Sequence, residues 1–182
     1  MAMNNYLIEG LSGTGKSSVC KELQKMGYRA IDADQSFSYF KDPKTELPTQ
    51  KINQFYLTWD TKKVEEALAH TTEPTFVCGG LVDMEKFMPY FKQIFILRVD
   101  NETLRKRLLT RKNNDFGKHP EDLQRQLEWN KGVEEYAKQK GATLIDATKP
   151  LSQVAQEILK YVEVLSVMSL LLKIRDVSLD KH

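Results

Sequence analysis

The segment from Gly10 to Ser17 constrains the fold of this chain more than any other feature. It reads GLSGTGKS and matches the pattern GxxxxGK[ST] at every fixed position. An apolar run, YLI at residues 6–8, precedes it, and a helix-forming stretch follows it. Glycines at positions 10, 13 and 15 allow the backbone to curl tightly between the two. The segment therefore predicts a buried strand, a tight loop and a helix in succession, which is the repeating unit of α/β folds.

The same segment has the chemistry of a phosphate-binding loop. Backbone N–H groups of such a turn form a nest for an anion, and the positive end of the following helix faces it. Lys16 would add positive charge at the β- and γ-phosphates of a nucleotide, and the Ser17 hydroxyl would bind Mg²⁺. A chance glycine-rich turn would not require these two side chains. The residues expected to contact the nucleotide here are Gly10, Ser12, Gly13, Thr14, Gly15, Lys16, Ser17 and Ser18.

Along the rest of the chain, short apolar runs alternate with longer periodic segments. This alternation predicts an α/β fold with a parallel sheet. The proline-containing residues 34–48 are expected to be irregular. Strands are expected at residues 5–9, 28–32, 75–78, 93–99 and 142–145. Helices are expected at residues 16–26, 52–70, 102–111 and 121–140, and from about 150–152 to beyond 161.

The composition excludes several classes of protein. The chain has 27 Lys and Arg residues against 25 Asp and Glu, a formal net charge of +2. This balance gives no basis for binding nucleic acid or a membrane surface. No apolar run reaches the roughly 18 residues of a membrane span, and the first residues do not resemble a secretory signal. Cys20 and Cys78 cannot build a disulfide framework, so we expect a reducing, cytoplasmic environment.

Two acidic residues follow the second predicted strand. Asp32 and Asp34 stand at its C-terminal end, and ligands of doubly wound sheets bind at the carboxyl ends of strands. There Asp34 could hold an acceptor or take a proton from its hydroxyl, and Asp32 could hold Mg²⁺ through water. The alternative is that both residues only form turns or cap a helix. The position of this pair, the one-domain length and the lack of a downstream NKxD motif favour a kinase over a GTPase.

The chain resembles the adenylate kinase and shikimate kinase group of small P-loop kinases over roughly residues 4–160. Within this group it is most similar to uncharacterised shikimate-kinase-like proteins. The resemblance implies a three-layer P-loop NTPase fold whose five-stranded parallel sheet has the order 2-3-1-4-5, with a short mobile lid at about residues 112–120. It also implies ATP and Mg²⁺ as cofactors. The segments that carry it are YLIEGLSGTGKSSVCKEL, GYRAIDAD, FVCGG, IFILRVDNETLRKRLLTR and GATLIDATKPL.

The resemblance also implies roles for residues outside the loop. Asp32 would lie on the magnesium side and Asp34 on the acceptor side, while Gly79 and Gly80 would face the acceptor. Arg107 and Arg111 match the arginines that open the lid of adenylate kinases.

By the same resemblance, Arg107 would stack on the adenine and Arg111 would contact the phosphates. The loop after the last strand would place Ala147, Thr148 and Lys149 near the adenine edge. The alternative for both arginines is a solvated helix face.

The acceptor region departs from both family patterns. Residues 35–70 contain no arginine, which a phosphate-bearing or shikimate-like acceptor requires, and the DGFPR signature of adenylate kinases is absent. We therefore expect a kinase that transfers the γ-phosphoryl group of Mg-ATP to a small hydroxyl acceptor. Two alternatives stay open: a nucleoside monophosphate kinase, and a nucleotide-binding regulatory protein with little turnover.

The C-terminal segment is apolar on two helical faces. One contains Ile158, Val162 and Leu165, and the other contains Val164 and Val167. One apolar face is enough for a helix to pack on a domain. The second apolar face therefore indicates that the helix also packs against another surface. We expect a kinase domain at residues 1–162 and a helical extension at 163–182. The extension either forms a homodimer or is buried within the fold.

Overall fold

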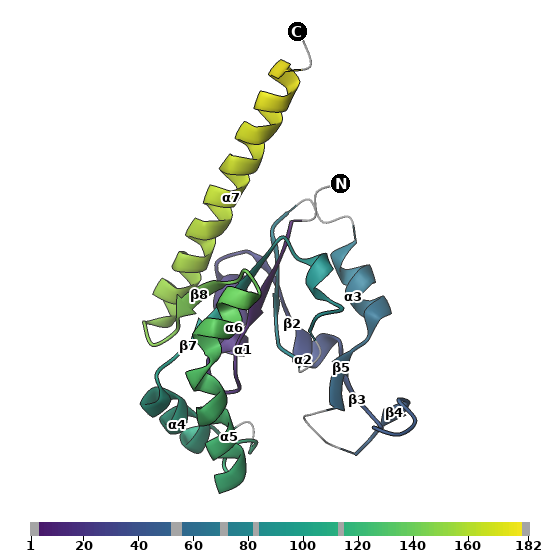
Figure 1. The fold of residues 1–182 in the computed structure, drawn as a ribbon, viewed down its shortest axis with the longest axis vertical. Helices are drawn as coiled ribbons and strands as arrows, with labels where there is room; N and C mark the ends of the chain where they lie inside the picture. The colour runs from purple at the N-terminus through teal and green to yellow at the C-terminus, as the bar shows by residue number, and fades with distance from the viewer. Residues whose placement is uncertain (1–3, 52–55, 70–72, 82–83, 113–114, 180–182) are drawn as a thin grey trace.

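The computed structural model describes residues 4–51, 56–69, 73–81, 84–112 and 115–179, and a five-stranded parallel sheet forms its centre (Figure 1). The strands lie in the order β2-β6-β1-β7-β8. Numbered along the chain within this sheet, that order is 2-3-1-4-5, so the predicted fold is confirmed. Their bounds are β1 (Asn5–Glu9), β2 (Arg29–Asp32), β6 (Thr75–Cys78), β7 (Gln93–Arg98) and β8 (Thr143–Asp146).

The central strand, β1, contributes to the core on both sides of the sheet. Tyr6, Leu7 and Ile8 are fully buried. Successive strand residues point to opposite faces, so Tyr6 and Ile8 pack in one apolar cluster and Leu7 in the other. A strand buried on both faces reads as a continuous apolar run, which is why residues 6–8 were recognisable in the sequence.

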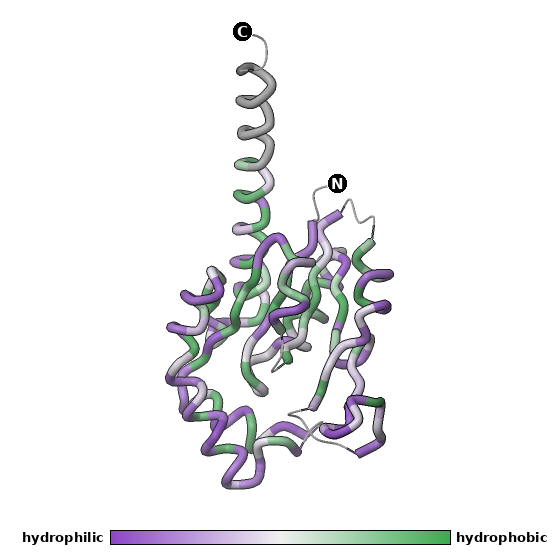
Figure 2. The backbone as a smooth tube through the Cα atoms, turned by 45° about the vertical axis from the view of Figure 1, so that its right-hand side comes forward, coloured by the Kyte–Doolittle hydropathy of each residue, from purple (hydrophilic) through white to green (hydrophobic). Residues whose placement is uncertain are grey.

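Helices cover both faces of the sheet. α1 (Lys16–Lys25) and the first part of α7 (Leu151–Leu179) pack on one face, and α3 (Thr61–Leu68), the 3-10 turn η2 (Met88–Tyr90) and α6 (Val133–Gln139) contribute to the other. Apolar residues follow the strands, while polar residues mark the outer surfaces (Figure 2). At the carboxyl ends of the strands lie α4 (Asn101–Thr110) and α5 (Pro120–Lys131).

The region after β2 is more regular than expected. Asp34 lies in a short helix, α2 (Ala33–Ser36), and a three-stranded antiparallel sheet follows in the order β4-β3-β5. Its strands are β3 (Ser38–Lys41), β4 (Pro48–Thr49) and β5 (Leu57–Trp59). The expectation of an irregular region at residues 34–48 is therefore wrong, because pairing with β5 fixes β3 as a strand.

The predicted helix at 52–70 is also wrong in its first part. Residues 52–55 and 70 lie outside the described residues, and Leu57–Trp59 form β5. The helix begins only at Thr61, because the Asp60 carboxylate accepts hydrogen bonds from the backbone N–H of Lys62 at 3.0 Å and of Lys63 at 3.3 Å. This N-cap fixes the helix start.

The single helix predicted over residues 121–140 is two helices. α5 ends at Lys131, and α6 begins at Val133 after Gly132, whose φ is −91° and ψ is 0°. These angles lie in a region that residues other than glycine also adopt. α6 continues from α5 after this one-residue break and lies near the end of β1, where the Tyr136 hydroxyl contacts Glu9.

α7 is the longest helix and extends beyond the sheet (Figure 1). Ile158 and Val162 are buried against the domain, whereas Val164 and Val167 are exposed. The predicted boundary at 162/163 falls inside this continuous helix, and the homodimer through its exposed side stays a prediction. Of the helices in the described part of the chain, none has the length and apolar character needed to cross a bilayer.

We expect Gly79→Ala to destabilise the fold. A Cβ at Gly79 would lie 2.7 Å from Ala33 Cβ and 2.8 Å from Trp59 Cζ2, so packed neighbours would have to move. Overpacking of this kind costs about 1–3 kcal/mol of the free energy of unfolding, measurable by urea denaturation. Gly132→Ala is the control, because its nearest contact would be 3.7 Å away. Equal stability of both variants would contradict this packing argument.

Candidate active site

The loop after β1 turns sharply at Gly10. Its φ is 151°, and a Cβ there would lie 2.7 Å from the Thr14 hydroxyl oxygen and 2.8 Å from a carbonyl oxygen of β7. The loop ends at Gly15, whose φ is 110°, and α1 starts at Lys16. The first N–H groups of a helix have no partner within it. The turn therefore brings an anion-attracting helix terminus to the carboxyl end of β1.

Lys16 is the positive charge at the centre of this site. Its Nζ donates to Gly10 O at 2.7 Å and to Leu11 O at 3.2 Å. Burial lowers the pKa of Lys16, while the carboxylate of Asp34 and then that of Glu9 act to raise it. Lys16 therefore lies within electrostatic reach of two carboxylates, one from the end of β1 and one from α2.

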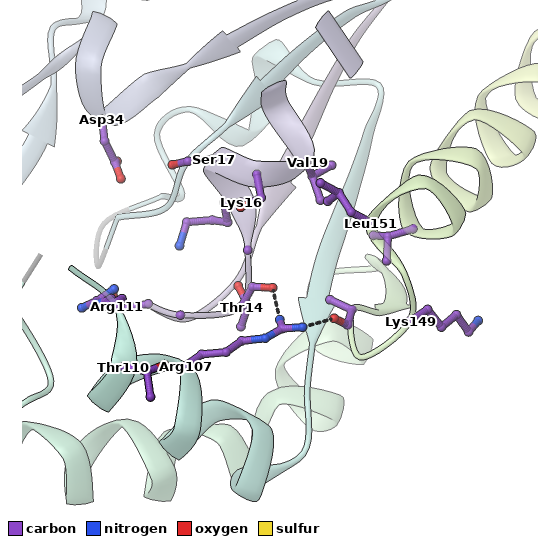
Figure 3. A pocket seen from close by; sticks show the side chains of 16 residues that line it. Thr14, Lys16, Ser17, Val19, Asp34, Arg107, Thr110, Arg111, Lys149 and Leu151 are labelled. Atoms are coloured by element: carbon purple, nitrogen blue, oxygen red, sulfur yellow. Dashed lines mark hydrogen bonds between the residues drawn. The ribbon is translucent and has the colours of Figure 1, made fainter. Parts of the chain in front are cut away.

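Two arginines of α4 reach across to the loop. Arg107 donates from Nη1 to Thr14 O at 3.1 Å and from Nη2 to Ala147 O at 2.9 Å, as the dashed lines in Figure 3 show. Arg111 donates from Nη1 to Ser12 Oγ at 3.0 Å and from Nη2 to a carbonyl of the α4–α5 connection. Its Nε is buried without a hydrogen-bond partner. Both guanidinium groups therefore face the loop, and the expected contacts of Arg107 with adenine and of Arg111 with the phosphates stay predictions.

These groups surround a cavity of about 550 Å³ (Figure 3). The charged ends of Lys16, Asp34 and Arg111 lie near one end of it, and Lys149 and Leu151 lie at the other. Its volume is typical of a small-molecule site. The residues that line it are Ser12, Gly13, Thr14, Gly15, Lys16, Ser17, Ser18, Val19, Asp34, Arg107, Thr110, Arg111, Ala147, Lys149, Leu151 and Val154.

Thr148 is placed differently from its neighbours. Ala147 and Lys149 line the cavity, but Thr148 is not among its lining residues. The Thr148 hydroxyl donates to Asp146 Oδ1 at 2.6 Å, and its backbone N–H donates to the same atom at 3.0 Å. Its side chain thus closes the turn after β8, and the expected contact with adenine stays a prediction.

The two acidic residues after β2 lie close to Lys16. The Asp34 side chain remains open to the cavity, yet its pKa is raised because surrounding protein displaces water from it. Lys16 opposes this shift and Asp32 adds to it. The Asp32 carboxylate has a buried Oδ1 with no hydrogen-bond partner.

The oxygen donors at this end fit a magnesium ion. Mg²⁺ prefers hard oxygen ligands and usually takes only one or two protein ligands beside water and phosphate. The Ser17 hydroxyl lines the cavity, and Asp32 offers an unpartnered carboxylate oxygen. In the described residues, three or more His, Cys, Asp or Glu side chains nowhere gather into a metal-binding group.

A second cavity, of about 610 Å³, adjoins the first. Ser12, Lys16 and Asp34 line both. The second lies between the end of β1 and helices α5 and α6, and its walls are mostly apolar. Its lining residues are Glu9, Gly10, Leu11, Ser12, Lys16, Asp34, Leu57, Gly80, Leu81, Ile96, Phe116, Gln126, Glu128, Trp129, Gly132, Val133 and Tyr136.

A carboxyl–phenol pair stands at the base of this second cavity. The Tyr136 hydroxyl donates to Glu9 Oε1 at 3.2 Å. Burial raises the pKa of Glu9, while the Tyr136 hydrogen bond and the charges of Lys16 and Lys140 act to lower it. Burial and the Glu9 charge raise the pKa of Tyr136, which stays a hydrogen-bond donor.

Three residues of this cavity were missed in the sequence: Glu9, Gln126 and Tyr136. The one local signal was Glu9, a charged residue at the end of an apolar run. Gln126 and Tyr136 belong to α5 and α6, which the sequence predicted as one helix, and nothing in the sequence placed them beside β1.

The two glycines after β6 differ in position. Gly80 lines the second cavity, and a Cβ there would lie 3.3 Å from Glu9 Cγ. Gly79 packs against Ala33 and Trp59 and lines neither cavity. Gly80 alone of the two lines the second cavity, and the expected position of both glycines beside an acceptor stays a prediction.

Solved structures similar to this chain are small kinases. A shikimate kinase from Acinetobacter baumannii in complex with shikimate aligns with a TM-score of 0.58 at 16% identity, covering 88% of this chain and 93% of that one. A deoxyadenosine kinase from M. mycoides with bound dATP aligns with a TM-score of 0.57 at 19% identity, covering 87% of this chain and 98% of that one. A gluconokinase from Sinorhizobium meliloti 1021 aligns with a TM-score of 0.52 at 20% identity, covering 88% of this chain and 92% of that one. At these identities the likeness establishes the fold of small P-loop kinases.

The sequence itself also identifies the family. No curated protein sequence matches the chain. A family profile described as "AAA domain" matches residues 7–128, which include the phosphate-binding loop, both acidic residues after β2 and both arginines of α4. Because this match spans more than half of the 182 residues, the chain belongs to the AAA domain family.

Proposed function

We propose that this protein is a kinase that transfers the γ-phosphoryl group of ATP to a hydroxyl group of a small acceptor. The observation that carries the proposal is the meeting of two cavities at Ser12, Lys16 and Asp34. The first cavity has the features of a nucleotide site. The second has room for another small molecule, and its contact with the first lies where the phosphate loop ends.

The first cavity supplies positive charge where a triphosphate needs it. Phosphoryl transfer depends on positioning and on neutralising phosphate charge more than on covalent chemistry by the protein. Lys16 and Arg111 would stabilise the charge that spreads over the transferred group. The Arg111 Nε, buried without a partner, is a donor suited to a phosphate oxygen. Arg107, held between Thr14 and Ala147, would lie against the base or ribose side of the nucleotide.

Ser17 and Asp32 would hold Mg²⁺, the first through its hydroxyl and the second through water. When bound, the ion neutralises charge on the β- and γ-phosphates. Ser17 lines the first cavity, whereas Asp32 lines neither cavity and would reach the ion through water. The unpartnered Asp32 Oδ1 is the observation that supports this role.

Asp34 is suited to act on the acceptor. It lies at the junction of the cavities, and its raised pKa brings it nearer to the pH at which it could exchange a proton. The acceptor oxygen would bond to the γ-phosphorus while the bond from that phosphorus to the bridging oxygen breaks. The hydroxyl proton would pass to the Asp34 carboxylate, leaving ADP and a phosphate monoester.

The alternatives differ in what they require. A nucleotide-binding regulatory protein would need the first cavity alone and would leave the second one unexplained. A nucleoside monophosphate kinase would need cations for the phosphate of its acceptor. Among the described residues that line the second cavity, Lys16 alone is a lysine or arginine. A hydroxyl acceptor without a phosphate is therefore favoured.

We expect Lys16→Ala to reduce ADP formation from Mg-ATP by at least about 100-fold, because a preorganised positive charge at the transferred group is lost. The assay measures ADP release with a panel of acceptors: nucleoside monophosphates, nucleosides, shikimate, gluconate and amino alcohols. Lys106→Ala is the control, since Lys106 is exposed on α4 and lines neither cavity. Equal rates in Lys16→Ala and the native protein would show that this loop does not carry the reaction.

We expect Asp34→Asn to lower kcat by about 10²- to 10⁴-fold, the usual contribution of a general base. Binding of ATP, followed by calorimetry, should persist. In the native protein, a base works only when ionised, so kcat/KM should rise with pH through a pKa above the ordinary aspartate value. Asp34→Asn should lose this rise. A variant that retains the native pH profile would exclude Asp34 as the base.

A further inference from the structure

The second cavity presents hydrogen-bond acceptors and negative charge. The carboxylates of Glu9, Asp34 and Glu128 line it, and Lys16 supplies the positive charge among its described lining residues. The internal segments outside the described residues, at 52–55, 70–72, 82–83 and 113–114, contain no lysine or arginine in the sequence. A ligand with a carboxylate or phosphate would therefore meet like charge in this cavity.

Gln126 adds an uncharged hydrogen-bond acceptor, which also favours a ligand that donates hydrogen bonds. Its side chain lines the cavity, only 3% of the residue is exposed, and its Oε1 has no hydrogen-bond partner. Buried polar atoms are nearly always paired, so an unpaired amide oxygen in a cavity wall indicates that a ligand supplies the donor. Glu9 can also accept a hydrogen bond from a ligand, because its carboxylate can accept several and the Tyr136 hydroxyl supplies one of them.

Lys16 cannot neutralise the charge of these carboxylates while its ammonium group binds the phosphates of a nucleotide. It faces both cavities and is the shared cation of Glu9 and Asp34. A bound triphosphate would attract its ammonium group. Glu9 and Asp34 would then lose the charge of Lys16 beside an anionic substrate, while Lys140 still acts on Glu9, and a cation in the second cavity would replace the charge of Lys16.

The remaining walls require an apolar skeleton. Aliphatic side chains and two aromatic rings surround the polar groups, and aromatic rings also favour contact with cations. These apolar lining residues are Leu11, Leu57, Leu81, Ile96, Phe116, Trp129 and Val133.

We propose that the ligand of the second cavity is a hydroxylated amine with an apolar or aromatic skeleton. Its ammonium group would be bound by Glu9 and would donate to Gln126 Oε1, and its hydroxyl would face Asp34. This inference rests on the proposed function, in which that hydroxyl accepts the phosphoryl group.

The test uses three probes that share a phenyl ring and a hydroxyl group but differ in charge. They are 2-amino-1-phenylethanol, 1-phenyl-1,2-ethanediol and mandelate, which are cationic, neutral and anionic at pH 7. Titration calorimetry of the full chain with a non-hydrolysable ATP analogue and Mg²⁺ measures their affinities. We expect the amine to bind at least about tenfold more tightly than mandelate, because a charge-assisted hydrogen bond is stronger than a neutral one.

Glu9→Gln tests the assigned contact, because Gln keeps an oxygen for the Tyr136 hydrogen bond and removes the charge. It should abolish the preference for the amine over the diol. Gln126→Met should weaken amine binding independently. Glu135→Gln is the control, since Glu135 is exposed on α6 and lines neither cavity, and it should leave the preference intact.

The outcomes separate this inference from the proposed function. Tighter binding of mandelate, no binding of any probe, or an unchanged preference in Glu9→Gln would overturn the inference. Phosphorylation of an anionic acceptor would also overturn it while supporting a kinase. If the amine binds as expected, yet no hydroxylated amine yields ADP from Mg-ATP, the assigned ligand class stands and the proposed phosphoryl transfer is wrong.

Discussion

The electrostatic interaction of Lys16 with two carboxylates is the one around which the candidate site is arranged. Glu9 ends the central strand, and the turn at Gly10 brings the chain back so that Lys16 Nζ lies 2.7 Å from Gly10 O. The parallel sheet places the end of β2 on the same edge, which brings Asp34 within electrostatic reach of the ammonium group. A Cβ at Gly10 would contact both the loop and β7. The tight turn is therefore what allows one lysine to face both cavities.

The nucleotide side of this arrangement was predictable because its information is local. The motif at residues 10–17 contains the turn, the cation and the helix start within one continuous segment. The strands were also recognisable, since strands buried on both faces appear as apolar runs. Strand order was not readable from such patterns and came from the resemblance. The early part of the 52–70 prediction was wrong because the pairing of β5 with β3, a contact between distant residues, outweighed a helical pattern.

The acceptor side was largely unpredictable for the same physical reason. The Tyr136 hydroxyl bonds to Glu9 across 127 positions of sequence, and Gln126 of α5 lines the same cavity as Glu9. The sequence directed attention to residues 35–70, which contribute Leu57 to the second cavity. It gave no indication that the helices after the lid form the opposite wall. Only an acidic residue at the end of a buried strand signalled this site in advance.

Because Lys16 lines both cavities, the proposed binding of nucleotide and acceptor cannot be independent. A phosphate that attracts the ammonium group weakens its interaction with Glu9 and Asp34, and the second cavity then favours a cation more strongly. Coupling between two sites is reciprocal at the level of binding free energy. A cationic acceptor paired with Glu9 would therefore release Lys16 toward the phosphates and strengthen nucleotide binding. An anionic acceptor would compete with the nucleotide for the same lysine. Lys16, the residue that binds the nucleotide, thus also determines which charge on the acceptor is preferred.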